Sequence, residues 1–293
     1  MPRTTRAMEI LRDTCAMRGH VRALKARGHS VGCVLTMGFL HAGHLALIAE
    51  CLRHADAVCV SIFVNPTQFG ERRDLDAYPT DIEGDLAKLK QAGVSAAFLP
   101  TPEVMYPEGA DTVVVVPGLS DILQGKVRPG HFQGVTTVVS KLFHILEPDV
   151  TVFGQKDYQQ LAIVRQMVRD MAMPIRVLGL PTVREEDGLA MSSRNVRLTP
   201  QDRAASVVLS QALDLAEKHE TDPLTAEEFR ALVREHIARE PRADIRAIDI
   251  RDAATLAPFY GRLTRPAVIL LSVRFGEILL IDNRVIGPDK DAL

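Results

Sequence analysis

Two histidines and two glycines lie close together near the start of the chain, in residues 35–45 (LTMGFLHAGHL). Gly38 and Gly43 would let a phosphate chain approach the backbone closely, because glycine carries no side chain. An imidazolium at His41 or His44 would add a positive charge and a proton donor near neutral pH. The segment therefore predicts a nucleoside triphosphate site, with the histidines facing the charge that develops as pyrophosphate leaves.

The residues around this segment predict that it lies where a strand turns into a helix. Residues 31–35 (VGCVL) form an apolar run typical of a buried strand, and apolar residues between Leu45 and Leu52 recur at helical spacing. We therefore expect His44 to open a helix. The unpaired N–H groups and the dipole at a helix start attract anions, which favours the same phosphate site.

Two other interpretations of His41 and His44 stay open at this point. The pair can form a polar turn with no chemical role. A zinc site is also possible but less well supported, because no cysteine or third histidine lies at ligand spacing nearby.

Two further segments carry groups that bind phosphate. Residues 191–195 (MSSRN) offer two hydroxyls and the guanidinium of Arg194, although such a run also suits a helix cap or turn. Residues 154–157 (GQKD) follow a predicted strand. There Lys156 would supply a point charge, and Asp157 would cap the next helix.

Amides and acids elsewhere suit a small polar acid and a metal. Gln68 and Gln160 could bond the hydroxyls and carboxylate of such an acid without neutralising it, or could simply lie on the surface. Residues 128–132 (RPGHF) add an arginine and a histidine ahead of a helix. An acidic stretch is mostly a solvated face, but one member could help to hold magnesium. Its members are Asp74, Asp76, Asp81 and Asp85.

Length and composition limit the class of protein. A chain of 293 residues, 46% of them hydrophobic, is long enough for two domains. The formal net charge of -2, from 35 basic and 37 acidic residues, weighs against a nucleic-acid partner. No run approaches the ~18 apolar residues of a membrane span. The four cysteines form no C-x-x-C pair and are expected to be reduced thiols of a cytoplasmic protein.

Apolar runs alternate with helical segments over the first two thirds of the chain. We expect strands at 31–35, 57–64, 96–99, 112–116, 150–153 and 175–178, with helices at 81–92, 135–146 and 157–171 between them. This alternation predicts an α/β fold, a Rossmann-like parallel sheet covered by helices on both faces. Ligands bind at the carboxyl ends of such strands, so the loops named above are expected to converge.

The last third of the chain has a different character. A polar connector at 181–188 precedes two amphipathic helices, at 201–218 and 225–239. Three short strands follow, at 245–250, 268–273 and 277–281. We therefore expect a catalytic domain at 1–182 and a smaller α+β domain at 183–293, which could close over the nucleotide as a lid.

The motifs, taken together, resemble those of pantothenate synthetases, the pantoate–β-alanine ligases of the HIGH-type nucleotidyltransferase superfamily. The resemblance covers nearly the whole chain and keeps the family's order and spacing. It is carried by residues 36–44 (TMGFLHAGH), 63–69 (FVNPTQF), 130–135 (GHFQGV), 153–157 (FGQKD), 187–195 (DGLAMSSRN) and 280–283 (LIDN).

The resemblance implies a two-step ligation. Pantoate and Mg-ATP would give pantoyl adenylate and pyrophosphate, and the β-alanine amine would then displace AMP to form pantothenate. It also implies a homodimer. The alternative within enzymes is a nucleotidyltransferase that acts on another small acceptor without forming an amide. A non-catalytic nucleotide sensor and an aminoacyl-tRNA synthetase are less consistent with the residues.

The resemblance also implies roles for individual residues. His44 would be the proton donor, with His41, Lys156 and Arg194 assisting at the phosphates. Gln68 would bind pantoate and β-alanine, Gln160 pantoate, and Asp85 the magnesium ion. ATP would be bound by Met37, Gly38, Phe39, Leu40, His41, Ala42, Gly43, His44, Gly154, Gln155, Lys156, Asp157, Val183, Met191, Ser192, Ser193 and Arg194.

Two positions depart from the family pattern. Leu35 stands where proline is common, and Gln155 where a charged residue is common. Neither position is expected to do chemistry. The loss of proline could loosen the turn that leads to the histidines.

Overall fold

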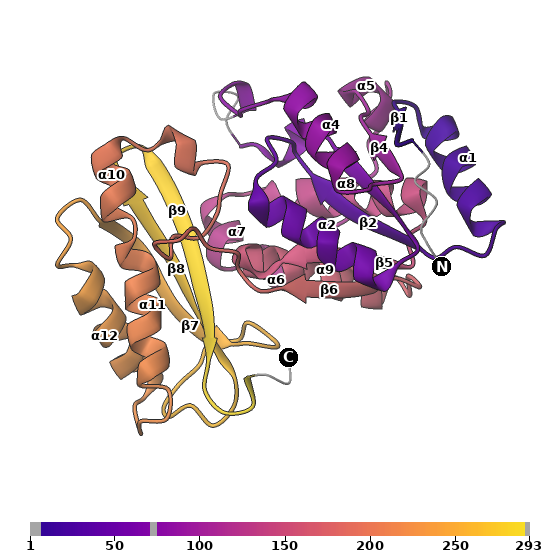
Figure 1. The fold of residues 1–293 in the computed structure, drawn as a ribbon. Helices are drawn as coiled ribbons and strands as arrows, with labels where there is room; N and C mark the ends of the chain where they lie inside the picture. Colours follow the sequence, from indigo (N-terminus) through magenta and orange to yellow (C-terminus); the bar gives the residue numbers. More distant parts are fainter. Residues whose placement is uncertain (1–6, 71–74, 291–293) are drawn as a thin grey trace. The chain divides into compact units, whose positions relative to one another are not determined.

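The computed structural model describes residues 7–70 and 75–290, and the chain folds as two compact units (Figure 1). The N-terminal unit comprises the chain up to Gly154 together with Gln159–Leu180. The C-terminal unit comprises Gln155–Tyr158 and the chain from Pro181 onward. A four-residue segment within the N-terminal sequence therefore belongs to the C-terminal unit.

A six-stranded parallel sheet forms the centre of the N-terminal unit, in the order β1-β4-β3-β2-β5-β6. This arrangement confirms the predicted α/β fold. The strands are β1 (Glu9–Leu11), β2 (Val31–Thr36), β3 (Ala57–Ile62), β4 (Ala96–Phe98), β5 (Val150–Gly154) and β6 (Arg176–Leu180).

Helices cover both faces of this sheet, which is why its central strands are apolar throughout. On one face the core contains residues of α1 (Thr14–Lys25), α8 (His131–Leu146) and α9 (Tyr158–Asp170). On the other face it contains residues of α2 (Ala42–His54) and α4 (Ile82–Gln91). Every residue of β3 is buried. Short helices α5 (Pro102–Met105), α6 (Pro117–Ser120) and α7 (Leu123–Val127) belong to the same unit.

The strand register brings the predicted functional loops to one edge of the sheet. Thr36 at the end of β2 pairs with Ile62 at the end of β3, so the loops that follow these strands leave side by side. The second loop contains the short 3-10 helix Pro66–Gln68. Because the strands are parallel, this is the edge at which ligands bind in such folds.

The C-terminal unit is built on a three-stranded antiparallel sheet. Its strands, β7 (Asp244–Asp252), β8 (Ala267–Phe275) and β9 (Ile278–Ile286), are nine residues each and longer than expected. Helices α11 (Val208–Lys218) and α12 (Ala226–Ile237) share a core with this sheet, and α10 (Pro200–Ala205) precedes them. The predicted small α+β fold is confirmed.

Several predicted elements were wrong in detail. Residues 112–116 form no strand, because side chains of α8 satisfy the backbone there: Val114 N–H donates to Thr137 Oγ1, and Thr136 Oγ1 donates to Val114 O. The predicted helix 201–218 is two helices, α10 and α11. Helix α8 begins at His131, and β1 and α1 were not predicted.

The cysteines behave as buried apolar residues in three of four cases. Cys33, Cys51 and Cys59 are buried and Cys15 is exposed, and all four are free thiols. Burial raises the pKa of Cys51 and of Cys59 to about 12, so these side chains stay protonated and poorly nucleophilic.

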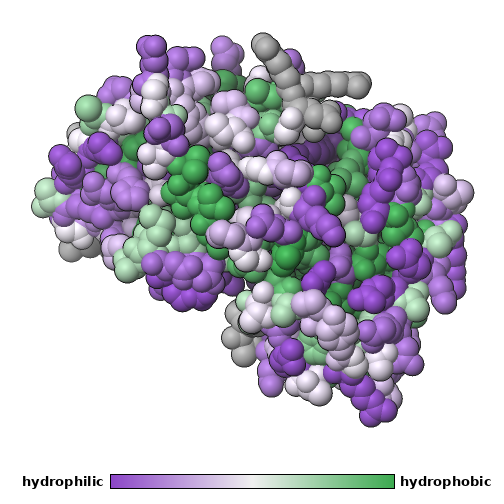
Figure 2. Space-filling view, turned by 180° about the vertical axis from the view of Figure 1, so that it is seen from behind, coloured by the Kyte–Doolittle hydropathy of each residue, from purple (hydrophilic) through white to green (hydrophobic). Residues whose placement is uncertain are grey.

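The surface is mixed in character. Figure 2 shows hydrophilic side chains spread over the face that it draws, with hydrophobic ones exposed in places between them. Within residues 7–70 and 75–290, no helix combines the length and the apolar character needed to cross a membrane.

Candidate functional site

The two histidines lie where β2 gives way to α2, as predicted. His41 is the N-cap of α2, and His44 stands in its first turn. His41 Nδ1 accepts the backbone N–H of Gly43 at 3.1 Å, and His44 Nδ1 accepts that of His41 at 3.3 Å. The two ring centroids are 4.1 Å apart. The histidines thus form a reciprocal cap that satisfies N–H groups of the helix start.

These bonds determine where each ring carries its proton. A ring nitrogen that accepts a hydrogen bond must hold a lone pair, so Nδ1 of both rings is unprotonated and the proton is on Nε2. These two contacts leave Nε2 of each ring as the nitrogen that could donate to a ligand.

A buried carboxylate holds the loop that precedes the histidines. Asp85 is fully buried, and its Oδ2 and Oδ1 accept the backbone N–H groups of Phe39 and Leu40, both at 2.7 Å. Lys88 Nζ donates to the carbonyl of Leu40 at 2.8 Å. The loop needs this support because Gly38 and Phe39 have φ angles of +87° and +52°, a region that costs energy for phenylalanine.

These contacts do not fit Asp85 as a magnesium ligand. Each of its oxygens already accepts a backbone N–H group, and the side chain is shut off from solvent. Of the other acidic candidates, Asp81 caps α4 and Asp76 is exposed, while Asp74 lies outside the described residues. Across the described part of the chain, no group of three or more His, Cys, Asp or Glu side chains could hold a metal ion.

Gln68 lies against the histidine loop. Its Nε2 is 2.9 Å from Met37 Sδ, although the two residues are 31 positions apart. Its Oε1 accepts a hydrogen bond from Asn65 Nδ2 at 3.2 Å, and its carbonyl accepts one from His131 Nδ1 at 2.8 Å. A predicted acid-binding amide is therefore next to a predicted nucleotide-binding residue.

Helix α8 and the Gln68 loop pack closely because residue 134 is glycine. A Cβ at Gly134 would lie 2.5 Å from the carbonyl oxygen of Thr67, closer than real side chains come. The predicted pantoate residue Gln160 is half-buried on the first turn of α9, and Gly154 ends β5. All of these residues belong to the N-terminal unit.

The GQKD segment divides between the units after its glycine. Gln155, Lys156 and Asp157 form a 3-10 turn of the C-terminal unit. Asn283 Nδ2, on β9, donates to the carbonyls of Gln155 and Lys156 at 2.9 and 2.8 Å. Two hydrogen bonds from one side chain thus fix the backbone that carries Lys156.

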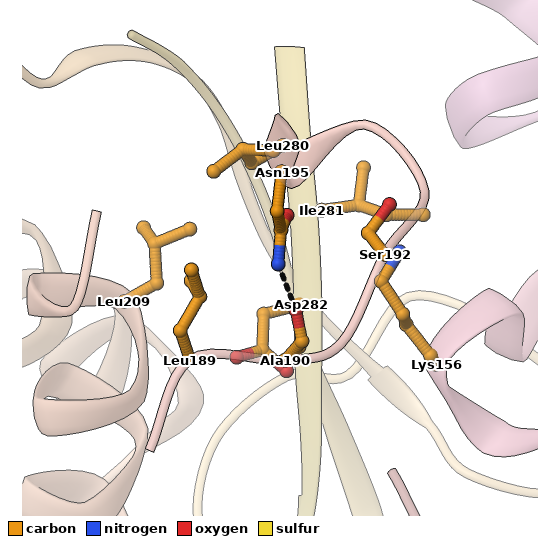
Figure 3. A pocket seen from close by; sticks show the side chains of 9 residues that line it. All are labelled: Lys156, Leu189, Ala190, Ser192, Asn195, Leu209, Leu280, Ile281 and Asp282. Atoms are coloured by element: carbon orange, nitrogen blue, oxygen red, sulfur yellow. Dashed lines mark hydrogen bonds between the residues drawn. The ribbon is translucent and has the colours of Figure 1, made fainter. Parts of the chain in front are cut away.

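Lys156 and Ser192 line one small pocket of the C-terminal unit (Figure 3). Asn195 lines it too, and its Nδ2 donates to the carbonyl of Ala190 at 3.1 Å and to Glu185 Oε1 at 2.8 Å. The full lining is Lys156, Leu189, Ala190, Ser192, Asn195, Leu209, Leu280, Ile281 and Asp282. A cation and a hydroxyl predicted to bind phosphate therefore share a pocket.

The connector that leads to Ser192 is a short hairpin. The backbone N–H of Met191 donates to the carbonyl of Val183 at 2.9 Å. Arg184 makes a bidentate ion pair with Asp282, with distances of 2.7 and 3.0 Å. The hydrogen bond from Arg203 lowers the pKa of Asp187, which keeps this carboxylate charged. Ser193 is buried and Arg194 half-buried just beyond.

Some residues that shape the site carried no functional signal in the sequence. Asn65 and Asn283 lie inside motifs that carry the family resemblance. An asparagine is also common in turns, so its residue type alone did not mark either one as a functional residue. Tyr106, whose hydroxyl donates to Asn65 Oδ1 at 2.8 Å, lies in no motif. The backbone role of Asp85 could not be read either, because it depends on a loop 46 positions away.

The chain is similar to known proteins along nearly its whole length. Residues 9–285 match the family described as Pantoate-beta-alanine ligase. The pantothenate synthetase of Agrobacterium fabrum is 48% identical over 289 residues, which are 97% of this chain and 98% of the relative.

Two solved structures extend the comparison. The pantothenate synthetase of Thermus thermophilus has a TM-score of 0.90 and 42% identity, covering 96% of this chain and 100% of that one. The Francisella tularensis pantoate-beta-alanine ligase, solved with beta-gamma ATP and beta-alanine, has a TM-score of 0.78 and 32% identity, covering 95% and 98%.

Proposed function

Because this chain belongs to the pantoate-beta-alanine ligase family, we propose how its own residues carry out the family's reaction. The chain is a ligase of pantothenate biosynthesis, which joins pantoate to β-alanine at the expense of ATP. The pantoate carboxylate is first converted to pantoyl adenylate with loss of pyrophosphate. The amine of β-alanine then displaces AMP to form the amide.

One observation carries the assignment of residues: Gln68 contacts Met37. Adenylation requires a carboxylate oxygen to meet the α-phosphorus of ATP, and orientation of the two reactants should provide much of the rate. The 2.9 Å approach of Gln68 Nε2 to Met37 Sδ supports an acid site next to the nucleotide loop.

In the first step, the histidine turn acts on the phosphates. The carboxylate oxygen of pantoate forms a bond to the α-phosphorus while the bond from that phosphorus to the bridging oxygen breaks. Pyrophosphate leaves with the electron pair. His44 Nε2–H donates to the phosphate oxygens as charge grows on them, and His41 assists. Residues 37–44 bind ATP through the loop that Asp85 holds.

In the second step, the neutral amine of β-alanine attacks the acyl carbon. The carbon–nitrogen bond forms, the bond to the AMP oxygen breaks with its electron pair leaving on AMP, and the amine releases a proton to solvent. Gln68 contacts pantoate and then β-alanine, and Gln160 contacts pantoate. Water must be kept from the mixed anhydride, because hydrolysis would waste the ATP.

The C-terminal unit supplies further ATP contacts in this proposal. Lys156 and Arg194 provide positive charge for the phosphates, and Ser192 and Ser193 provide hydroxyls. Lys156 and Ser192 line the same small pocket, so these two groups lie near one another in the C-terminal unit. Gly154, Gln155, Asp157, Val183 and Met191 complete the proposed ATP set, with 1–182 as the catalytic domain and 183–293 as the lid domain.

Magnesium enters the proposal as the ion that accompanies ATP and offsets the charge of the triphosphate. No residue is proposed as its ligand, because the oxygens of Asp85 bond to the backbone. A cytoplasmic location and a homodimer are also proposed, and both rest on the family.

Product analysis tests the function. Purified protein with ATP, pantoate and β-alanine should yield AMP, pyrophosphate and pantothenate in equal amounts, and omission of either acid should stop pantothenate formation. ADP as the product, or nucleotide transfer without an amide, would contradict it. The second outcome would instead support a nucleotidyltransferase, which the named relatives do not favour.

A further inference from the structure

Three polar side chains beside the nucleotide loop form a one-way chain of hydrogen bonds. Tyr106 O–H donates to Asn65 Oδ1 at 2.8 Å, Asn65 Nδ2 donates to Gln68 Oε1 at 3.2 Å, and Gln68 Nε2 approaches Met37 at 2.9 Å. The direction of this chain decides which atoms of Gln68 face the substrates.

The orientation of Asn65 follows from its partners. The carbonyl oxygen of Gly134 lies 3.2 Å from Nδ2 of Asn65, and a carbonyl can only accept, so the amide nitrogen must be on that side. Oδ1 then faces Tyr106 O–H and the hydroxyl of Thr67, which is 3.0 Å away. Both hydroxyls can donate to Oδ1. The oxygen of the amide therefore faces donors, and its nitrogen faces an acceptor.

The orientation of Asn65 in turn sets that of Gln68. Because Asn65 presents an N–H, Gln68 must turn its oxygen toward Asn65 and its Nε2 toward Met37. The backbone beside it is held separately, since the Gln68 carbonyl accepts from His131 Nδ1 at 2.8 Å. The main chain and the amide plane of Gln68 are therefore both fixed.

Tyr106 is well placed to hold this orientation. Its ring packs 6.3 Å from Phe63, centroid to centroid, and Lys141 Nζ lies 5.0 Å from the ring centroid. Burial raises the pKa of Tyr106, although the bond with Thr67 opposes this, so the phenol keeps its proton at neutral pH.

We propose that Tyr106 is a positioning residue which, through Asn65, makes Gln68 an N–H donor toward the acid substrates. This inference rests on the proposed role of Gln68. An amide N–H bonds the carboxylate or hydroxyl oxygens that pantoate and β-alanine carry, and it repels an ammonium group. With the amide reversed, Gln68 Oε1 would bond the β-alanine ammonium, which must lose its proton to act as a nucleophile.

The first test compares the KM values for pantoate and β-alanine with the KM for ATP in the Tyr106→Phe variant. This substitution removes only the hydroxyl group. The loss of one hydrogen bond, about 1 kcal/mol, corresponds to roughly a fivefold change. We expect the KM for pantoate or β-alanine to rise roughly threefold to tenfold, while the KM for ATP stays within twofold. Thr67→Val removes the second hydroxyl and should act in the same direction. Tyr260→Phe, at a tyrosine that is 77% exposed, is the control for loss of a phenol.

The second test is a double-mutant cycle with Gln68→Ala. If Tyr106 acts through Gln68, Tyr106→Phe should have no further effect on the KM values of the Gln68→Ala enzyme. An equal increase in both backgrounds, or no increase in the Tyr106→Phe and Thr67→Val single variants, would overturn the inference and leave the proposed function intact. Unchanged KM values in Gln68→Ala would overturn the proposed role of Gln68 itself, and this inference with it.

Discussion

The carboxylate of Asp85 accepts a hydrogen bond from the backbone N–H of Leu40, with Oδ1 and N 2.7 Å apart. The same carboxylate holds Phe39, and Lys88 bonds the carbonyl of Leu40. The start of α4 and its first turns thus fix the loop that leads into the histidine cap. The buried carboxylate of Asp85 therefore serves the backbone of this loop.

Removal of this carboxylate should lower activity because the loop that leads to the histidines would lose its fixed conformation. In Asp85→Ala, two backbone N–H groups lose a charged acceptor, and we expect a loss of about 3 kcal/mol in the free energy of unfolding. The kcat of adenylate formation should fall at least tenfold, because the loop no longer sets the histidines. Urea unfolding and pyrophosphate release measure the two effects.

The dependence of activity on magnesium concentration distinguishes a backbone-holding role of Asp85 from a role as metal ligand. If Asp85 only holds the backbone, the magnesium concentration for half-maximal activity should be unchanged in Asp85→Ala. A large increase would instead make Asp85 a metal ligand. Asp81→Asn is the matched control, since it removes an exposed charge from the N-cap of the same helix.

The protonation of His41 and His44 can be measured directly. Because both Nδ1 atoms accept backbone N–H groups, ¹⁵N chemical shifts of the imidazoles should show the neutral tautomer with the proton on Nε2 at neutral pH. Shifts typical of imidazolium at both nitrogens would contradict this account of the helix cap.

The contribution of His44 to the reaction should be large. His44→Ala removes the group that we propose as the donor to the developing phosphate charge, so adenylate formation should fall by ~10²–10⁴-fold. Rapid-quench measurement of pyrophosphate release isolates this step. Turnover close to that of the unaltered protein would exclude His44 from the mechanism.

Asn283 should affect ATP binding or adenylation by holding the backbone that carries Lys156. Asn283→Ala removes both bonds to the 155–156 backbone, so the KM for ATP should rise several-fold or adenylation should slow. The variant should have no added effect in a Lys156→Ala background. Additive losses would show that Asn283 acts elsewhere. Arg274→Ala, at an exposed ion pair with Asp244 in the same sheet, is the control.

Buried parallel strands were the most predictable part of the fold. Residues 31–35 and 57–64 are apolar because helices cover both faces of β2 and β3, so their composition alone marked them as strands. The histidine turn followed from its place between such a strand and a periodic helix. Residues 112–116 have a similar composition, but hydroxyls of α8 replace a neighbouring strand there.

Contacts between distant residues were the part that could not be predicted. Whether Asp85 faces a metal or a backbone depends on the path of residues 38–40, and no local pattern encodes that path. The hydrogen bond from Asn283 to the carbonyl of Lys156 links residues that are 127 positions apart in the sequence. Tyr106 is an ordinary tyrosine after a short helix until its contact with Asn65 is seen.

Transfer of an isotopic label tests the central claim, that the pantoate carboxylate attacks the α-phosphorus of ATP, most directly. Pantoate labelled with ¹⁸O in its carboxylate should be incubated with ATP and β-alanine, and the AMP analysed by mass spectrometry. The account predicts one ¹⁸O atom in each AMP formed, because the bond from oxygen to phosphorus survives when the amine displaces AMP. Unlabelled AMP, or label found in inorganic phosphate beside ADP, would contradict it.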